Sequence, residues 1–372
     1  MTGAPSRPGA TRPDGLRAPL PDRPALVRPG APAEPGERRR ARHDRFAEQP
    51  GLGVAGLLLV VPSAVLLAAA VGGPEGSLLV LAPLITFSLP IVAMVAFWWE
   101  DWPGSRLRKP WAGIVDTVLI AIAAVLLTIA GQAIIGHANP RAVFDPAPGP
   151  DHAPTFPGTL PLAAPAFVAM LQLTLVCEGW PLRRLPRIAG GATALAVSWA
   201  VAVILYLTLG TPAFGAYLVL VGLWQVWIFV VWRGWPFARI TRRWIRIPTA
   251  NLVVLSGAWP TYLAARSVAD PPLIQAWAGM AIAAGLIVGM LFQGWAQRFL
   301  SPPWERAVTL AATIALAAAL YAITAAIAGA IDFKRVQPEE WIGHVGLNAL
   351  GLAVISHVAI GHRWPFHAPI HS

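Results

Sequence analysis

Long apolar blocks alternate with short polar connections from residue 52 to residue 361. Each block has about 17 to 28 residues, the length at which a helix crosses the hydrocarbon core of a bilayer. The ten blocks are 52–71, 78–97, 111–135, 160–176, 188–209, 214–232, 249–265, 273–292, 304–331 and 341–361. An aqueous core does not need ten helices that are apolar on every face. The pattern predicts an all-α, polytopic membrane protein with ten transmembrane helices.

Composition supports this reading and narrows the chemistry. The chain is 56% hydrophobic and 12% charged, whereas soluble domains carry about 25% charged residues. The single cysteine, Cys177, excludes an intrachain disulfide and a paired-cysteine metal site. We therefore predict no metal site.

The first 50 residues differ from the rest. They are rich in Pro, Gly, Ala and Arg without apolar periodicity, so we expect a disordered tail at 1–50 and a membrane domain at 51–372. The basic cluster Arg38–Arg45 precedes the first apolar block, where anionic lipid headgroups would attract it. A partner-binding tail is the alternative. The net charge of +10 thus indicates a lipid surface and no nucleic acid.

The distribution of basic residues predicts the orientation in the membrane. The tail, the connections after every second block and the C-terminal end hold 24 of the 28 Lys and Arg residues. The loops on the other side hold four, namely Arg141, Arg266, Lys334 and Arg335. The positive-inside rule then places both termini in the cytoplasm of a cell-membrane protein.

A short motif recurs at the end of every second block. Its copies are WWEDWP, VCEGWP, VWRGWP, LFQGWA and IGHRWP, with the tryptophans Trp102, Trp180, Trp235, Trp295 and Trp364. The first four copies lead into a basic connection and a proline that we expect to open the next helix (Pro110, Pro186, Pro248 and Pro303). The register predicts five tandem helical hairpins, related by an axis along the membrane normal. The tryptophans anchor the helix ends at the interface, and the prolines stop the helices.

The residue two positions before each motif tryptophan is polar in every copy, yet its chemistry changes. These residues are Glu100, Glu178, Arg233, Gln293 and His362. If the hairpins surround a common axis, the five side chains converge in an inner vestibule as a network or a gate. In the alternative, each side chain simply reaches water at its own helix end.

Further polar residues fall inside the apolar blocks. Asp116 lies about 9 Å into its helix, where a carboxylate has to be paired or hydrated. It either marks a transport pathway or pairs structurally, for example with Arg233. Gln225 precedes Arg233 by eight residues and falls near the same helix face.

The last block is rich in histidine. His344, Asn348 and His362 share one face, and His357 points elsewhere. Axial haem ligation at His344 would require a second histidine, and His137 is the candidate. No cofactor is predicted on this ligand count.

Three function classes remain open. The first is a permease or channel-like transporter with polar residues between the hairpin repeats, as transporter sites often form at repeat interfaces. The second is a membrane-embedded redox or other enzyme subunit that uses the histidines of the last helix. The third is a non-catalytic accessory subunit that packs against a membrane partner.

Overall fold

The computed structural model describes residues 48–108, 111–136, 138–145, 155–209 and 212–366. All regular structure in these ranges is helical, without a strand. This is expected in lipid, because a helix satisfies its backbone hydrogen bonds within its own segment. The basic cluster Arg38–Arg45 and the rest of the tail up to residue 47 lie outside the described residues, as do Pro110 and His137.

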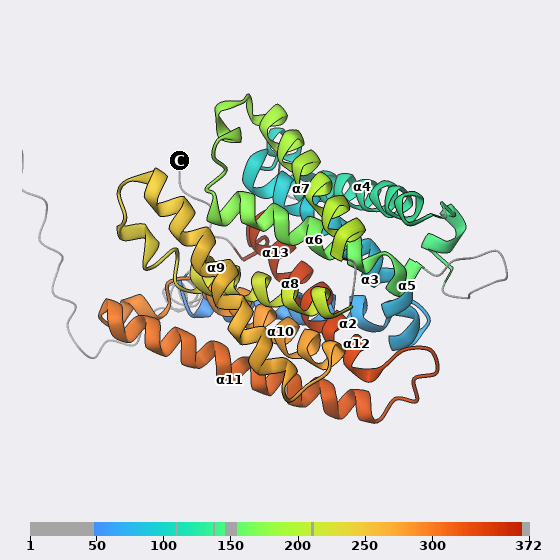
Figure 1. Ribbon diagram of the computed structural model, residues 1–372. Helices are drawn as coiled ribbons and strands as arrows, with labels where there is room; N and C mark the ends of the chain where they lie inside the picture. Colours follow the sequence, from blue (N-terminus) through green and yellow to red (C-terminus); the bar gives the residue numbers. More distant parts are fainter. Residues whose placement is uncertain (1–47, 109–110, 137, 146–154, 210–211, 367–372) are drawn as a thin grey trace, which may run out of the picture. The chain divides into compact units, whose positions relative to one another are not determined.

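Each predicted apolar block corresponds to a helical segment of the described chain (Figure 1). The segments are α2 (Gly51–Ala69), α3 with η1 (Gly73–Ala93, Met94–Trp98), α4 (Trp111–Ile135), α6 with η4 (Leu160–Leu171, Gln172–Val176), α7 (Arg187–Leu209), α8 with η6 (Pro212–Gln225, Val226–Val231), α9 (Arg243–Arg266), α10 with η8 (Pro271–Leu286, Ile287–Leu291), α11 (Pro302–Gly329), and finally α12, η10, α13 and η11 (Pro338–Gly343, His344–Leu350, Gly351–Ile355, Ser356–Ile360). Short helices η3 (Pro140–Val143) and α5 (Thr155–Gly158) lie between α4 and α6.

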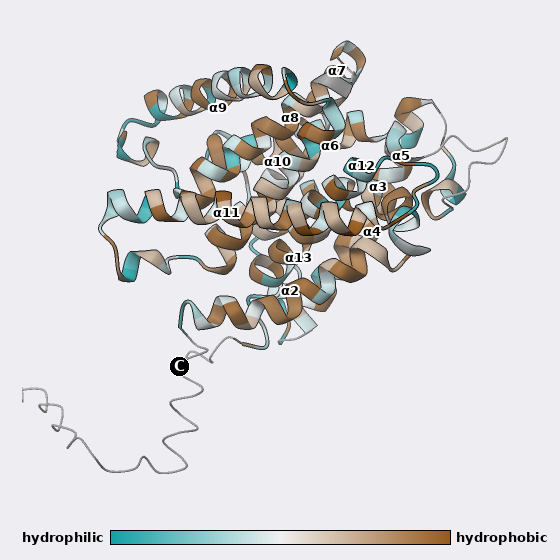
Figure 2. Ribbon diagram, turned by 90° about the horizontal axis from the view of Figure 1, so that it is seen from below, coloured by the Kyte–Doolittle hydropathy of each residue, from teal (hydrophilic) through white to brown (hydrophobic). Residues whose placement is uncertain are grey.

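Eight of these segments are long and apolar enough to cross a membrane. The other two are Leu160–Val176, which is apolar but shorter, and α9, which carries Asn251 and two prolines. Figure 2 shows apolar residues over the middle of the helices and hydrophilic ones mainly in the connections. The all-helical membrane fold is thereby supported, with eight candidate spans.

The helices form two layers. Consecutive inner helices contact one another in the order α3, α6, α8, α10 and α12–α13, and the last of them contacts α3 again. Each remaining long helix packs mainly on one inner helix: α4 on α3, α7 on α6, α9 on α8, α11 on α10, and α2 on η10 and α13. In Figure 1, α4, α7, α9 and α11 accordingly lie around α8 and α10.

The packed pairs differ from the simplest hairpins that the sequence suggests. Blocks 111–135 and 160–176 form α4 and α6, which make little contact in the described chain. The closer neighbour of α4 is the preceding inner helix α3. The first four copies of the motif therefore lie in the short connections inside packed pairs, and the fifth follows η11. We term the end of the bundle that carries these copies the motif end.

One predicted helix start is wrong. Pro248 does not open its helix, because α9 begins at Arg243 and includes Pro248. Basic side chains stabilise the additional turn: Arg246 donates to the Ile240 carbonyl (3.0 Å) and to Glu178 (2.7 Å). Pro248 is the sixth residue of α9, beyond the first four N–H groups that lack an intrahelical partner, so it leaves the Trp244 carbonyl without its helical donor.

Glycines allow the inner helices to approach closely. A Cβ atom added at Gly346 would lie 2.7 Å from the backbone of Gly279, on the neighbouring inner helix. The same atom at Gly289 would lie 2.7 Å from Val230 Cγ1. Small residues serve this purpose in membrane bundles, where packing replaces the hydrophobic effect between helices. The outer helices instead carry large exposed apolar residues, such as Leu58, Leu126 and Leu207.

Candidate functional site

A cavity of about 390 Å³ lies between the inner helices. Its described lining comes from α3, α6, α8, α10 and α12–α13 and reaches from Glu339 and Glu340, at the end opposite the motifs, to Phe97 and Met290 near the motif end. Pockets of about 300 to 1,000 Å³ that are mostly apolar, with a few polar groups, are typical small-molecule sites. The cavity is therefore the primary candidate site.

The lining follows the register of the motif. All five residues that lie twenty positions before a motif tryptophan face the cavity, and so do all five that lie thirteen positions before it. These two layers are Ala82, Leu160, Gly215, Gln275 and His344, and then Leu89, Phe167, Gly222, Ile282 and Gly351. Further layers with four of five members occur at sixteen, nine and five positions before the tryptophan. The same positions of each copy thus face the cavity.

Polarity is confined to the layers farther from the motif end. Gln275 and His344 belong to the layer twenty positions before the tryptophan, and Thr86 and Asn348 to the layer at sixteen. The layers at thirteen, nine and five contain only apolar residues and glycine, for example Phe97 and Met290. The cavity thus has a partly polar half and an apolar half.

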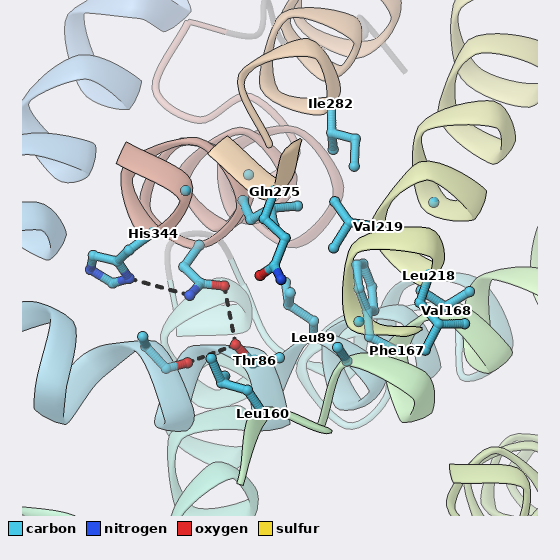
Figure 3. A pocket seen from close by; sticks show the side chains of 18 of the residues that line it. Thr86, Leu89, Leu160, Phe167, Val168, Leu218, Val219, Gln275, Ile282 and His344 are labelled. Atoms are coloured by element: carbon cyan, nitrogen blue, oxygen red, sulfur yellow. Dashed lines mark hydrogen bonds between the residues drawn. The ribbon is translucent and has the colours of Figure 1, made fainter. Parts of the chain in front are cut away.

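His344, Asn348 and Thr86 form one hydrogen-bonded chain on one wall (Figure 3). Nε2 of His344 lies 3.2 Å from the Leu67 carbonyl oxygen, so it carries the proton and donates. Nδ1 then accepts from Asn348 Nδ2 at 3.2 Å. Thr86 Oγ1 lies 3.2 Å from Asn348 Oδ1 and 2.7 Å from the Ala82 carbonyl, and its one proton serves one of them at a time. These bonds occupy both nitrogens of His344, and one N–H of Asn348 has no acceptor in the described part of the chain.

Gln275 provides the second polar group of the cavity. Its side chain extends between the wall that holds His344 and the wall that holds Val219 (Figure 3). No described residue forms a hydrogen bond with its amide, and its nearest counterpart across the layer is Gly215, where an added Cβ would lie 3.7 Å from Nε2. This amide is free to bind a ligand.

A shared backbone conformation defines the motif end. The inner helices end in the π-helical segments η1, η4, η6, η8 and η11. A residue in the left-handed region follows in four copies: Glu100, Glu178, Arg233 and His362 have φ between 49° and 53°. The next backbone N–H then donates six residues back, as from Gly179 to the Leu173 carbonyl. Each Trp–Pro bond of the motif is cis.

Left-handed backbone turns the variable polar side chain away from its own helix. Three of these side chains reach the first turns of outer helices that belong to the next packed pair: Glu100 binds Arg187 (3.0 Å), Glu178 binds Arg246 (2.6 Å), and Arg233 binds Glu305 (2.5 Å). His362 binds Asp101, in the connection between α3 and α4, at 3.2 Å. The residues do not converge on the cavity. They link neighbouring packed pairs, and each Glu or Arg of the motif has an oppositely charged partner.

The fourth copy differs. Gln293 is exposed and forms no hydrogen bond among the described residues, and Trp295 is followed by Ala296 instead of proline. Its connection is held through Arg298, which binds Glu48 (3.0 Å) and the Gln49 carbonyl (2.8 Å) just before α2.

Asp116 belongs to a buried cluster beside the contact between His362 and Asp101. Its Oδ1 accepts from the Gly104 backbone N–H at 2.9 Å, and Oδ2 has no hydrogen-bond partner among the described residues. Asp101 Oδ1 is equally buried and unpartnered. Burial raises the pKa of the Asp101 carboxyl; His362 opposes the shift, and Asp116 and Glu100 add to it. Asp116 is therefore not paired with Arg233, and it lies outside the cavity.

Gln225 belongs to a different network, between α6, α8 and α9. Its Nε2 donates to Gln172 Oε1 (2.5 Å), and Gln172 Nε2 donates to Asn251 Oδ1 (2.7 Å). Asn251 also lies 3.6 Å from the Cys177 sulfur. Burial raises the pKa of the Cys177 thiol, and the bond from Asn251 opposes this. Gln225 thus packs behind the cavity wall.

The motif tryptophans differ in their surroundings. Trp180 and Trp364 are about half exposed, while Trp235 stacks below the guanidinium of Arg306 at 4.7 Å. Trp102 has a buried indole N–H without a partner.

The fold and the cavity define the chain as an all-helical membrane protein with an inner ring of helices around a mainly apolar site. No protein-family model, no curated protein and no solved structure matches the chain. Its function therefore has to be argued from the site.

Sequence reasoning missed Gln275, Thr86 and Glu305. The repeat register would have found the first two, because Gln275 aligns with His344, and Thr86 with Asn348. Glu305 follows Pro303 in the first turn of its helix, where an acid is most simply read as favourable to the helix dipole.

Proposed function

We propose that this chain is a permease or channel-like protein of the cell membrane, with both termini in the cytoplasm and the central cavity as its pathway. In this proposal all ten helical segments cross the bilayer, and the five packed pairs are structural repeats. The shared register of the cavity lining supports the repeats. The observation that carries the proposed function is the ring of inner helices that encloses the cavity along its length.

The two halves of the cavity suggest how passage is controlled. Water and small polar groups enter most easily beside Gln275, Asn348 and Glu339. The layer formed by Phe97, Leu175, Val230 and Met290 closes the motif end with apolar side chains, and hydrophobic constrictions of this kind gate by dewetting. The protein would therefore rest in a state that is closed toward the cytoplasm.

Thiol accessibility tests the pathway. Cys177 is the only cysteine, so Cys177→Ser gives a background for single cysteines. Val219→Cys faces the cavity, and the control Val201→Cys lies on α7 with its side chain partly exposed toward lipid. A charged, membrane-impermeant thiosulfonate added from outside should modify Val219→Cys at least about tenfold faster, because a thiol reacts as its thiolate and needs water. Equal, slow modification at both positions rules out an aqueous pathway.

A further inference from the structure

The substrate class can be inferred from the free polar groups of the cavity and from the charges around it. Among the described lining residues, the open uncharged hydrogen-bonding groups are the Gln275 amide and one N–H of Asn348. Both are uncharged, and both lie in the half of the cavity away from the motif end. A polar head group would bind there, and the rest of the ligand would meet only apolar layers. Such a division fits an amphiphile with one small head group.

Two features restrict the charge of that head group: the lack of basic residues in the described lining and the carboxylates at the opening. Among the described lining residues, no Lys or Arg is present, so a buried anion would find no compensating charge. Burying an uncompensated charge is strongly unfavourable. The two ionisable carboxylates of the lining, Glu339 and Glu340, stand at the opening. Glu340 is engaged by the Gln337 backbone N–H at 2.9 Å. They would repel an anion on approach and accept a cation or a neutral donor.

We infer that the cavity binds an amphiphile with a long apolar chain and a hydrogen-bonding head group that carries no negative charge, with the head at Gln275 and Asn348. This rests on the proposed function in that the cavity is taken as the site of passage. The chain of the ligand would lie along Ile282, Leu286 and Met290 of the α10–η8 wall.

Photolabelling of the full-length protein in lipid nanodiscs tests the inference. The probes are an alkyl alcohol, amine and carboxylate with one identical diazirine-bearing chain, and peptide mapping locates the label. The alcohol and the amine should label Ile282 and Leu286, and excess untagged alcohol should suppress this label. Exposed outer residues such as Leu126 and Leu207 provide the internal reference for probe dissolved in lipid. Labelling of the cavity by the carboxylate at the level of the alcohol overturns the inference, as does label confined to the outer residues.

Two matched variants locate the head and the chain. Gln275→Leu keeps the side-chain size but removes the amide, and should lower alcohol labelling of the cavity about three- to tenfold, the value of one hydrogen bond. Val219→Trp fills the cavity and should abolish the label, whereas Val201→Trp on the lipid side of α7 should leave it unchanged. Unaltered labelling in Gln275→Leu contradicts the assigned head site. If a variant does not fold, competition in the wild-type protein still tests the inference: untagged alcohol should suppress the cavity label, and an unsuppressed label contradicts a specific site.

The two proposals fail in different ways. If Val219→Cys reacts with the water-soluble thiosulfonate but no alcohol labels the cavity, the pathway stands and the ligand class is wrong. If alcohol labels the cavity while Val219→Cys remains as slow as Val201→Cys, the amphiphile site stands and the aqueous pathway is wrong.

Discussion

The inner and outer helices are similarly apolar, but they differ in how much of their surface is buried within the protein. The most apolar stretch of the inner segment Gly73–Trp98 is 83% buried within the protein, and that of the outer helix Pro302–Gly329 only 11%. Inner helices contact protein on most faces, so their glycines set backbone distances and their π-helical ends set the direction of the chain. Outer helices leave many apolar side chains exposed, and neighbours fix few of them.

Polar links at the motif end join neighbouring packed pairs, and the links are not equivalent. The side chain of Glu305 has 6% of its surface exposed, whereas that of Glu100 has 74%. An exposed pair contributes little because water and salt screen it. A buried charge that loses its partner costs far more. The same motif position therefore has different energetic weight in different copies.

The largest effect is expected at the buried link. Glu305→Gln should lower the free energy of unfolding by about 2 to 3 kcal/mol, because Arg233 then lacks its countercharge in a partly buried site. The matched change Glu100→Gln should cost less than about 1 kcal/mol. Denaturant titration in mixed micelles measures both. Equal losses would show that burial does not distinguish the copies. Arg233→Ala combined with Glu305→Gln should cost less than the sum of the two single changes.

A somewhat smaller effect is expected where two inner helices touch. Gly346→Ala places a methyl group 2.7 Å from the Gly279 backbone and should cost about 1 to 3 kcal/mol through overpacking. The control is Gly329→Ala near the end of outer helix α11, where an added Cβ meets nothing within 4 Å. That change should be neutral or stabilise by up to about 1 kcal/mol, because alanine favours helix more than glycine. Thermal unfolding in detergent compares them, and a tolerated Gly346→Ala would contradict the close inner packing.

The sequence predicted the helices well because hydropathy and lipid constrain the same segments. Block 160–176 matches the observed Leu160–Val176 at both ends, and 111–135 matches α4. The prediction that Pro248 opens its helix was wrong, because α9 begins at Arg243 and Arg246 stabilises this earlier start. Hydropathy could not separate inner from outer helices, because both are apolar on all sides.

The candidate site was harder to predict than the fold. Asp116 was suspected because it is a carboxylate within an apolar block, and the structure places it against the Gly104 backbone, outside the cavity. His344 and Asn348, suspected because they share a helix face, do lie together in the cavity wall. The polar motif residues were expected at a vestibule or in water. Their left-handed backbone, which redirects them to the next pair, is not visible from residue types, since Glu and Arg rarely adopt it.

The smallest effect concerns the link between the last inner helix and the first packed pair. Burial keeps the pKa of Asp101 above its ordinary value, with Glu100, Asp116 and His362 as the charged neighbours. From about pH 4 upward through the raised pKa, the native protein holds this proton more often than the unfolded chain, so stability falls as pH rises. Asp101→Asn removes this contribution and should flatten the decline.

Melting temperatures across this pH range measure the slope. The control is Asp332→Asn, an exposed aspartate beyond the end of α11 whose side chain is 80% exposed; it should retain the wild-type slope. Parallel curves for Asp101→Asn and the wild type would show that the Asp101 carboxyl does not contribute to the pH dependence of stability. A flattened curve only in Asp101→Asn would show that the buried Asp101 carboxyl is the source of the slope.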